Sequence, residues 1–290
     1  MVGAGGGGRL GRTPTMATVA EPHYDSIADG YARWWAPVIR PAAEALLDHL
    51  WPAHGEQRAL RMLDVGTDTG TLAVATLARW PSFRVTGIDV SGAMLELARR
   101  TAAERLPAAL TDRYEQRIAE AADLPFPDAS FDAAVSSFVL QLVPSRSAAL
   151  REIRRVLRPG GTFGWMTWHR SSREFAPDRI VNAVLDEAGF DPPEPDVRSG
   201  DLASTAAAAQ AMRRAGFRAV RATAGELEHR WDAAGYLEFF SRFDEASLFD
   251  ELEPGERNEL LARMRDRLDR LDEAELTLRL PLVYVIGQAG

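Results

Sequence analysis

The stretch MLDVGTDTGTLA, residues 62–73, has the residue types and spacing of a cofactor-binding turn. An apolar run reaches Asp64, breaks at Gly66 and resumes as a helix-like segment after Gly70. A strand, a tight turn and a helix start in this order predict a site for a nucleotide-like cofactor. The next predicted strand ends FRVTGIDV and places Asp89 at its tip, 19 residues after Gly70. A carboxylate there suits ribose hydroxyls, although acids at strand ends often serve as helix caps instead.

Asp68, in the middle of this turn, separates two classes of cofactor. A dinucleotide loop has the pattern G-x-G-x-x-G, in which bare backbone amides face a pyrophosphate. Here Asp68 takes the place of the second glycine, and a carboxylate close to two phosphates is strongly unfavourable in a partly buried site. S-adenosylmethionine carries a sulfonium and an ammonium instead, so it tolerates an acid that could hydrogen-bond the ammonium. Asp68 could equally be a helix N-cap that satisfies free amides.

The composition excludes several other chemistries. The chain has no cysteine, which excludes disulfides, thiolate catalysis, cysteine zinc fingers and iron–sulfur ligation. It has no lysine either, so neither a pyridoxal Schiff base nor a P-loop can form. The net charge of −8 argues against nucleic acid as the main partner. No apolar run approaches the roughly 20 residues of a membrane span, and we expect a cytoplasmic protein.

Predicted strands and helices alternate between residues 60 and 168. Connecting helices of about 10–15 residues between strands indicate a parallel, doubly wound sheet. Strands are expected at 60–65, 83–90, 114–121, 131–139 and 161–168, and helices at 71–80, 91–104 and 145–157, with RPGG as a turn before the fifth strand. Nearly continuous apolar strands agree with helices on both faces.

The remaining segments are predicted to surround this core. Helices are expected at 21–38, 41–52, 175–190, 205–217, 231–249 and 253–272, and strands at 217–225 and 276–287. The helical stretch 231–272 would form a lid over the carboxyl edge of the sheet. We expect a disordered leader over 1–20 and a single domain over 21–290, a size that suits one large α/β domain. Within it, a cofactor-binding core covers 58–168, substrate or lid elements cover 21–52, 169–200 and 231–275, and the last strand covers 277–287.

Five ordered motifs resemble those of class I S-adenosylmethionine-dependent methyltransferases. They are MLDVGTDTG, GIDVSGAML, AEAADLPFPDASFD, AAVSSFVLQLV and LREIRRVLRPGGTF. The chain is most similar to ubiquinone and menaquinone C-methyltransferases and related small-molecule methyltransferases. The resemblance implies a Rossmann-like α/β fold, a mostly parallel seven-stranded sheet with helical N-terminal and lid additions, and S-adenosylmethionine as cofactor.

The resemblance also implies roles for the residues of the first two motifs. Asp64, Gly66, Thr69 and Gly70 would shape the loop around the methionine part of the cofactor, with Asp68 replacing a glycine of the family pattern. Asp89 would bind the ribose hydroxyls.

The later motifs would hold the adenine and the reactive end of the cofactor. Val90 and Met94 would flank the adenine. Glu120, one methylene longer than the usual aspartate, would accept from the adenine amino group, and the Ala121 amide would face the ring. Ser137 would lie near the reactive end.

An N-terminal helix also matches the family pattern, and one residue after the fourth strand differs from it. Tyr24 and Tyr31 match a helix that closes over the cofactor in relatives. Gln141 stands where relatives often have histidine. The fourth strand lacks the Asn/Asp-Pro-Pro-aromatic motif of enzymes that methylate DNA bases or protein amides, which counts against those substrates.

The sulfonium methyl is already reactive, so catalysis needs alignment and exclusion of water more than covalent help. His169, just past the fifth strand, is the predicted general base, although it could be an ordinary loop histidine, and His229 is a weaker candidate. Aromatic residues that would line an acceptor pocket, or else belong to the core, are Trp34, Trp35, Trp168 and Trp231. No metal site is expected.

The leading hypothesis is methyl transfer to O, C or N of a small quinone, aromatic or natural-product acceptor. One alternative is a protein of this fold that binds the cofactor but catalyses a non-methylating reaction such as cyclisation, or senses the cofactor. A weaker alternative is an NAD-dependent oxidoreductase. The expected partner is a small molecule, with no nucleic acid and no membrane span.

Overall fold

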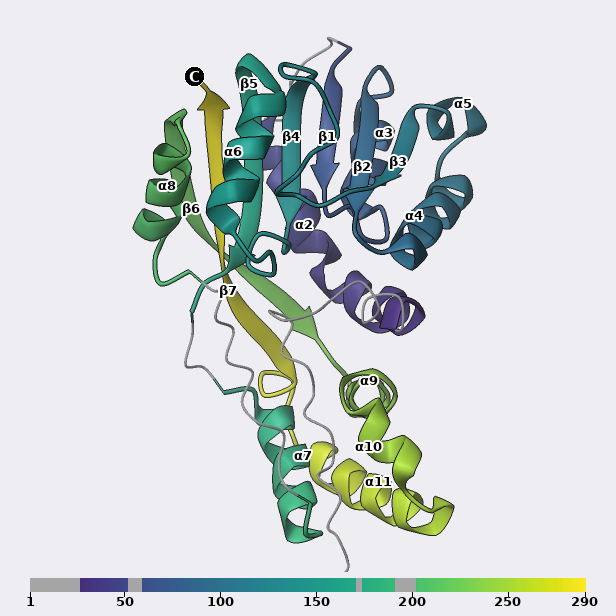
Figure 1. The fold of residues 1–290 in the computed structure, drawn as a ribbon. Coiled ribbons are helices and arrows are strands. Elements are labelled where there is room, and N and C mark those ends of the chain that lie inside the picture. Colours follow the sequence, from purple (N-terminus) through teal and green to yellow (C-terminus); the bar gives the residue numbers. More distant parts are fainter. Residues whose placement is uncertain (1–26, 52–58, 171–173, 191–201) are drawn as a thin grey trace, which may run out of the picture.

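The computed structural model describes residues 27–51, 59–170, 174–190 and 202–290. Seven strands form one sheet: β1 (Arg61–Val65), β2 (Arg84–Asp89), β3 (Tyr114–Ile118), β4 (Phe131–Ser137), β5 (Leu157–Trp168), β6 (Phe217–Arg230) and β7 (Thr277–Ala289). Their order is β3-β2-β1-β4-β5-β7-β6 (Figure 1). Strands β1 to β5 pair in parallel, and β7 is antiparallel to both neighbours. The predicted mostly parallel sheet of seven strands is confirmed.

The order of the strands places a binding site at the carboxyl end of β1. From β1 the chain builds outward through β2 and β3, then returns to add β4 on the other side of β1. Asp64 consequently pairs with Gly87 of β2 on one side and with Val135 of β4 on the other. Ligands of open α/β sheets bind where the strand order reverses in this way, because the loops leaving the two strands diverge.

Helices cover both faces of the sheet, as the apolar strands predict. One face packs on α2 (Ala36–Leu50), α3 (Thr71–Arg79) and α4 (Gly92–Arg105), and the other on α6 (Arg146–Val156) and α8 (Thr205–Arg214). Successive strand residues alternate between the two cores, so that Met62 faces one and Leu63 the other. A short α5 (Ala108–Thr111) precedes β3. The doubly wound architecture is therefore confirmed.

A second group of helices lies at the far end of the long β6–β7 hairpin (Figure 1). It comprises α7 (Ala176–Glu187), α9 (Ala233–Phe239), the π-helical turn η3 (Phe240–Asp244), α10 (Ala246–Glu251) and α11 (Pro254–Leu268). The Tyr236 hydroxyl donates to Asp178 Oδ1 over 2.6 Å and joins α9 to α7. Glu187 pairs with Arg263 and Arg267 and joins α7 to α11. These helices contain most of the predicted lid and lie beyond the carboxyl edge of the sheet.

Three predicted boundaries differ from the structure. RPGG lies inside β5, where it is accommodated as a register shift opposite Phe131 and Ala133 with Gly160 at φ +78°. β6 continues to Arg230, because β7 offers it pairing partners as far as Thr277. The predicted break before Pro41 does not occur, since η2 (Tyr31–Trp35) and α2 are continuous and Pro41 lies within α2.

The predicted leader over 1–20 lies outside the described residues. None of the described helices combines the length and the apolar character that crossing a bilayer requires.

Candidate functional site

The turn after β1 adopts a backbone that its glycines permit. Gly66, Asp68 and Gly70 all have positive φ, at 69°, 51° and 82°. A Cβ on Gly66 would lie 2.2 Å from Cγ2 of Val139, and one on Gly70 would lie 3.2 Å from the backbone of Ala98 in α4. Asp68 occupies the left-handed region with a side chain, which aspartate tolerates better than most residues. The turn therefore packs tightly between α4 and the loop after β4.

Asp64 holds this turn from inside. It is 1% exposed, and the Thr67 hydroxyl donates to its Oδ2 over 2.7 Å. Thr67 is also within 2.7 Å of the Tyr114 hydroxyl on β3. Burial raises the pKa of Asp64 to about 7, despite the Thr67 hydrogen bond. Asp64 thus has buried partners of its own within the turn.

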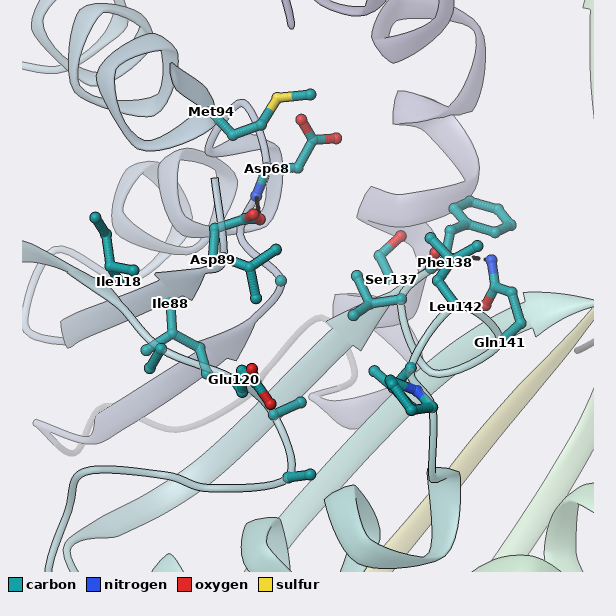
Figure 2. A pocket seen from close by; sticks show the side chains of 18 of the residues that line it. Asp68, Ile88, Asp89, Met94, Ile118, Glu120, Ser137, Phe138, Gln141 and Leu142 are labelled. Atoms are coloured by element: carbon teal, nitrogen blue, oxygen red, sulfur yellow. Dashed lines mark hydrogen bonds between the residues drawn. The ribbon is translucent and has the colours of Figure 1, made fainter. Parts of the chain in front are cut away.

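Asp89 connects the turn to the following helix. Its Oδ2 accepts from the Asp68 amide over 3.0 Å, and its Oδ1 accepts from the Ser91 amide over 3.1 Å. Ser91 is in turn the N-cap of α4, where its hydroxyl accepts from the Met94 amide over 3.1 Å. Two amide donors thus fix the position of the Asp89 carboxylate. The carboxylate that closes the turn therefore also faces the cavity (Figure 2).

The Asp68 side chain faces the cavity and does not cap α3. The cap position of α3 is Gly70, while the Asp68 carboxyl accepts from the Tyr31 hydroxyl and the Thr69 amide. Its Oδ1 is buried and has no hydrogen-bond partner among the described residues. Burial raises the pKa of Asp68 to about 8, against the Tyr31 hydrogen bond and with added repulsion from Asp89. An unpaired buried carboxylate oxygen is costly, so this position is suited to a ligand that donates hydrogen bonds or carries positive charge.

A cavity of about 570 Å³ opens at the carboxyl ends of β1, β2 and β4 (Figure 2). Its volume is in the range of small-molecule and cofactor sites. Nine predicted site residues share its lining: Tyr31, Gly66, Asp68, Asp89, Val90, Met94, Glu120, Ala121 and Ser137. Asp64 lines a smaller neighbouring cavity, which also borders Gly66 and Asp68. Thr69 and Gly70 lie within the turn itself, and Tyr24 lies outside the described residues.

Sequence reasoning missed several apolar side chains in this cavity, and Ile118 is the most exposed of them. Ile118, at the end of β3, is 64% exposed, the largest exposure of any described large hydrophobic residue, and lines the cavity near Val90. Ile118 shares a face of β3 with the buried Tyr114 but lies at the carboxyl end of the strand, and its exposure there could have indicated a ligand-facing surface.

The loop after β4 forms the opposite wall. Phe138 has φ +56°, an uncommon conformation for an aromatic residue. Gln141 Nε2 donates to the Phe138 carbonyl over 2.7 Å, and Thr167 Oγ1 donates to Gln141 Oε1 over 2.9 Å. Gln141 therefore supports the loop, and its side-chain amide is engaged at both ends. The neighbouring Ser137 Oγ is buried and has no hydrogen-bond partner in the described part of the chain.

Two of the four predicted pocket tryptophans line the cavity. Trp35 and Trp168 do so, with ring centroids 6.3 Å apart. Trp231 packs instead on Phe239, with centroids 5.1 Å apart, and neither it nor Trp34 is among the described lining residues.

Neither candidate histidine is among the described lining residues of this cavity. His169 follows β5, where its backbone amide donates to the Pro281 carbonyl over 2.9 Å, and it is not among the described lining residues. His229 packs against Trp231, and burial lowers its pKa. The predicted role of His169 as a base therefore gains no support from its position and stays a prediction. Within the described ranges, no group of three or more potential metal ligands occurs.

Comparison with known proteins agrees with this geometry. A family model described as "Methyltransferase domain" matches residues 63–164. The ubiquinone/menaquinone biosynthesis C-methyltransferase UbiE of Geotalea daltonii is 42% identical over 35% of this chain and 42% of its own length. The chain spans about half the length of this and the next curated relatives it matches. Nocamycin O-methyltransferase of Saccharothrix syringae is 30% identical over 91% of this chain and 96% of its own length.

This chain belongs to the methyltransferase family. The family match runs from within β1 to within β5 and so includes the glycine turn, Asp89 and the loop after β4. Among solved structures, the [4+2]-cyclase SpnF superposes with a TM-score of 0.55 over 95% of this chain and 97% of its own, at 20% identity. At that identity the likeness shows the shared fold alone.

Proposed function

We propose that this chain transfers a methyl group from S-adenosylmethionine to a small organic acceptor. The observation that carries the proposal is the pair of buried, unpartnered polar atoms, Asp68 Oδ1 and Ser137 Oγ, at the cavity within the described chain. Asp68 supplies an acceptor for an ammonium donor and a charge opposite to that of a sulfonium. Membership of the methyltransferase family supports the same cofactor.

The other cavity residues suit the remaining parts of this cofactor. Asp89 is the group for the ribose hydroxyls, since its carboxylate is positioned by two amides, lies at the end of β2 and lines the cavity. Val90, Met94 and Ile118 offer apolar surface for the adenine, with Glu120 and Ala121 at its edge. Every charged side chain among the described lining residues is acidic, which disfavours a pyrophosphate and therefore NAD.

When bound, S-adenosylmethionine supplies an electrophilic methyl group on a sulfonium sulfur. The chain then has to hold the acceptor in line and keep water away. The rigid wall built by Phe138 and Gln141, together with Trp35 and Trp168, is suited to that task. We further propose that the methyl group goes to O, C or N of a quinone, aromatic or natural-product acceptor. We also propose that residues 21–290 form one domain and that the protein is cytoplasmic.

Calorimetric titration tests the cofactor. We expect S-adenosylmethionine and S-adenosylhomocysteine to bind and NADH not to bind, and Asp89→Ala to weaken binding of both by roughly a hundredfold, because it removes a charged hydrogen-bond partner and loosens the turn. Binding of NADH without binding of S-adenosylmethionine would reject the proposal.

Transfer of labelled methyl to a panel of phenols, quinols, enols and amines tests the reaction. Label in any product supports methyl transfer. Consumption of an acceptor with the cofactor unchanged would instead favour a non-methylating reaction such as cyclisation.

A further inference from the structure

Four aromatic rings contact one another in a row from the helices at the end of the hairpin to the end of β4. Phe239 of α9 stacks on Trp35, with centroids 5.8 Å apart and planes 26° apart. Trp35 meets Trp168 at 6.3 Å and 47°, and Trp168 stacks on Phe138 at 4.1 Å and 28°. Trp35, Trp168 and Phe138 all line the cavity. The two tilted tryptophans therefore form an aromatic corner inside it.

The π-helical turn η2 sets this corner beside the proposed cofactor position. The Ala36 amide donates to the Tyr31 carbonyl and closes the wide turn, so that Tyr31 and Trp35 both face the cavity from one turn of helix. The Tyr31 hydroxyl bonds the Asp68 carboxyl. Trp35 consequently lies next to the residues assigned to the methionine part of the cofactor, on the side toward Trp168.

The free surface of the corner belongs to Trp35. Trp168 and Phe138 are only 6% and 7% exposed, and they pack on one another. Trp35 is half-buried and is therefore more exposed than Trp168 or Phe138. The adjacent cavity wall is apolar, formed by Leu142, Val143 and Pro144. A flat ring gains both buried apolar area and stacking geometry in such a corner.

We propose that Trp35 is the specificity-determining residue for the acceptor, and that the acceptor presents a flat, conjugated, uncharged ring that stacks on Trp35 in the corner formed with Trp168. The inference rests on the proposed function and names the substrate class of the same site. An anionic ring is disfavoured, because Asp68, Asp89 and Glu120 give the described lining a negative charge.

Two probes with one carbon skeleton test the proposal. Calorimetric titration of 2-naphthol and of its saturated counterpart, decahydro-2-naphthol, into protein saturated with S-adenosylhomocysteine compares a flat conjugated ring with a puckered one. We expect 2-naphthol to bind about two- to tenfold more tightly to the wild type, because stacking adds to the burial of apolar area. We expect Trp35→Ala to weaken 2-naphthol binding about tenfold or more and to abolish the preference, and Trp35→Phe to retain it.

Trp34→Ala is the matched control. Trp34 is the neighbouring residue in η2, and the Arg33 guanidinium lies 4.9 Å from its ring centroid. Because Trp34 is not among the described lining residues, its loss should change 2-naphthol affinity less than twofold. Trp35→Leu replaces the alanine variant if that variant fails to fold.

Affinity for S-adenosylhomocysteine, measured on every protein, separates the two proposals. Wild type that binds S-adenosylhomocysteine but binds neither probe, or binds both equally, overturns the acceptor inference and leaves the proposed function standing. An unchanged preference in Trp35→Ala also overturns it. Failure of the wild type to bind S-adenosylhomocysteine would count against the proposed function itself.

Discussion

At the scale of single residues, Asp68 is the most informative position of the site. It combines positive φ, a buried oxygen without a partner in the described chain, and a pKa raised to about 8 by burial. These features are unfavourable in the protein alone, since an ionised carboxylate would lack solvation. They become favourable when a cation binds, which is the usual relation between a strained site and its ligand.

Asp68→Asn should raise thermal stability and lower cofactor affinity. The pKa of Asp68 is about 8 in the folded chain and 3.8 in the unfolded chain. Between these two pH values the unfolded chain has lost the proton that the folded chain keeps, so the free energy of unfolding falls as the pH rises. The variant lacks this loss, and its melting temperature should exceed that of the wild type by a few degrees at pH 8.5 and by less at pH 5. Scanning calorimetry and titration with S-adenosylmethionine check both effects.

Asp68→Gly is the companion variant, because it restores the glycine of the family pattern and suits the positive φ. Equal cofactor affinity in wild type and both variants would remove Asp68 from the ammonium site.

His169→Ala should lower kcat less than tenfold, because the described cavity lining does not include this side chain. Loss of a general base would instead lower kcat by roughly 10²–10⁴-fold. Steady-state kinetics with an accepted substrate distinguish the two, and His229→Ala serves as control, since His229 packs on Trp231. A decrease in the larger range, with a changed pH profile, would restore His169 as the base.

At the scale of elements, the loop after β4 is held by one side-chain amide. Gln141 accepts from Thr167 on β5 and donates to the Phe138 carbonyl, and it thereby joins the loop to the neighbouring strand. Phe138 is held with positive φ, and its ring stacks on Trp168 with planes 28° apart. The aromatic wall therefore depends on a hydrogen-bonded support beneath it.

Gln141→Leu should destabilise the folded protein by about 1–3 kcal/mol, because the Phe138 carbonyl and the Thr167 hydroxyl lose their partner in a buried position. Denaturant unfolding measures the change. Thr167→Val is the matched control, since it removes one of the two hydrogen bonds and leaves the Gln141 to Phe138 bond intact. An effect of Gln141→Leu no larger than that of Thr167→Val would show that the loop does not depend on this bond.

At the scale of the whole molecule, charge and architecture both restrict the partner. The net charge is −8, and every charged residue in the described lining of the cavity is acidic. The helices carried by the β6–β7 hairpin lie beyond the carboxyl edge, and Phe239 from α9 stacks on Trp35 in the cavity wall. A small, uncharged acceptor in this cavity agrees with both features.

The protein should not bind nucleic acid. Acidic proteins release few counterions from a phosphate backbone, so no salt-dependent affinity is expected. Fluorescence anisotropy with labelled duplex DNA and RNA at about 50 mM salt checks this, with a basic nucleic-acid-binding protein as positive control. Binding that weakens steeply with added salt would contradict the assignment to small molecules.

The sequence alone predicted the parts of this protein that depend on local patterns. Alternating apolar strands and helices of the right length indicated the doubly wound sheet, because buried parallel strands need helices on both faces. The positions of Gly66, Gly70 and Asp89 indicated the cofactor turn, because its backbone geometry requires glycine and its strand end offers an acid. Local spacing was sufficient there.

Only the tertiary structure decided which distant side chains meet. Tyr31 reaches Asp68, Thr167 reaches Gln141, and Trp35 reaches both Phe239 and Trp168. No periodicity encodes these contacts, since they depend on how η2, β5 and α9 pack across the end of the sheet. The burial that leaves Asp68 Oδ1 unpartnered within the described chain also arises from that packing. The cofactor turn could therefore be predicted from the sequence, whereas the contacts of the aromatic corner could be identified only in the tertiary structure.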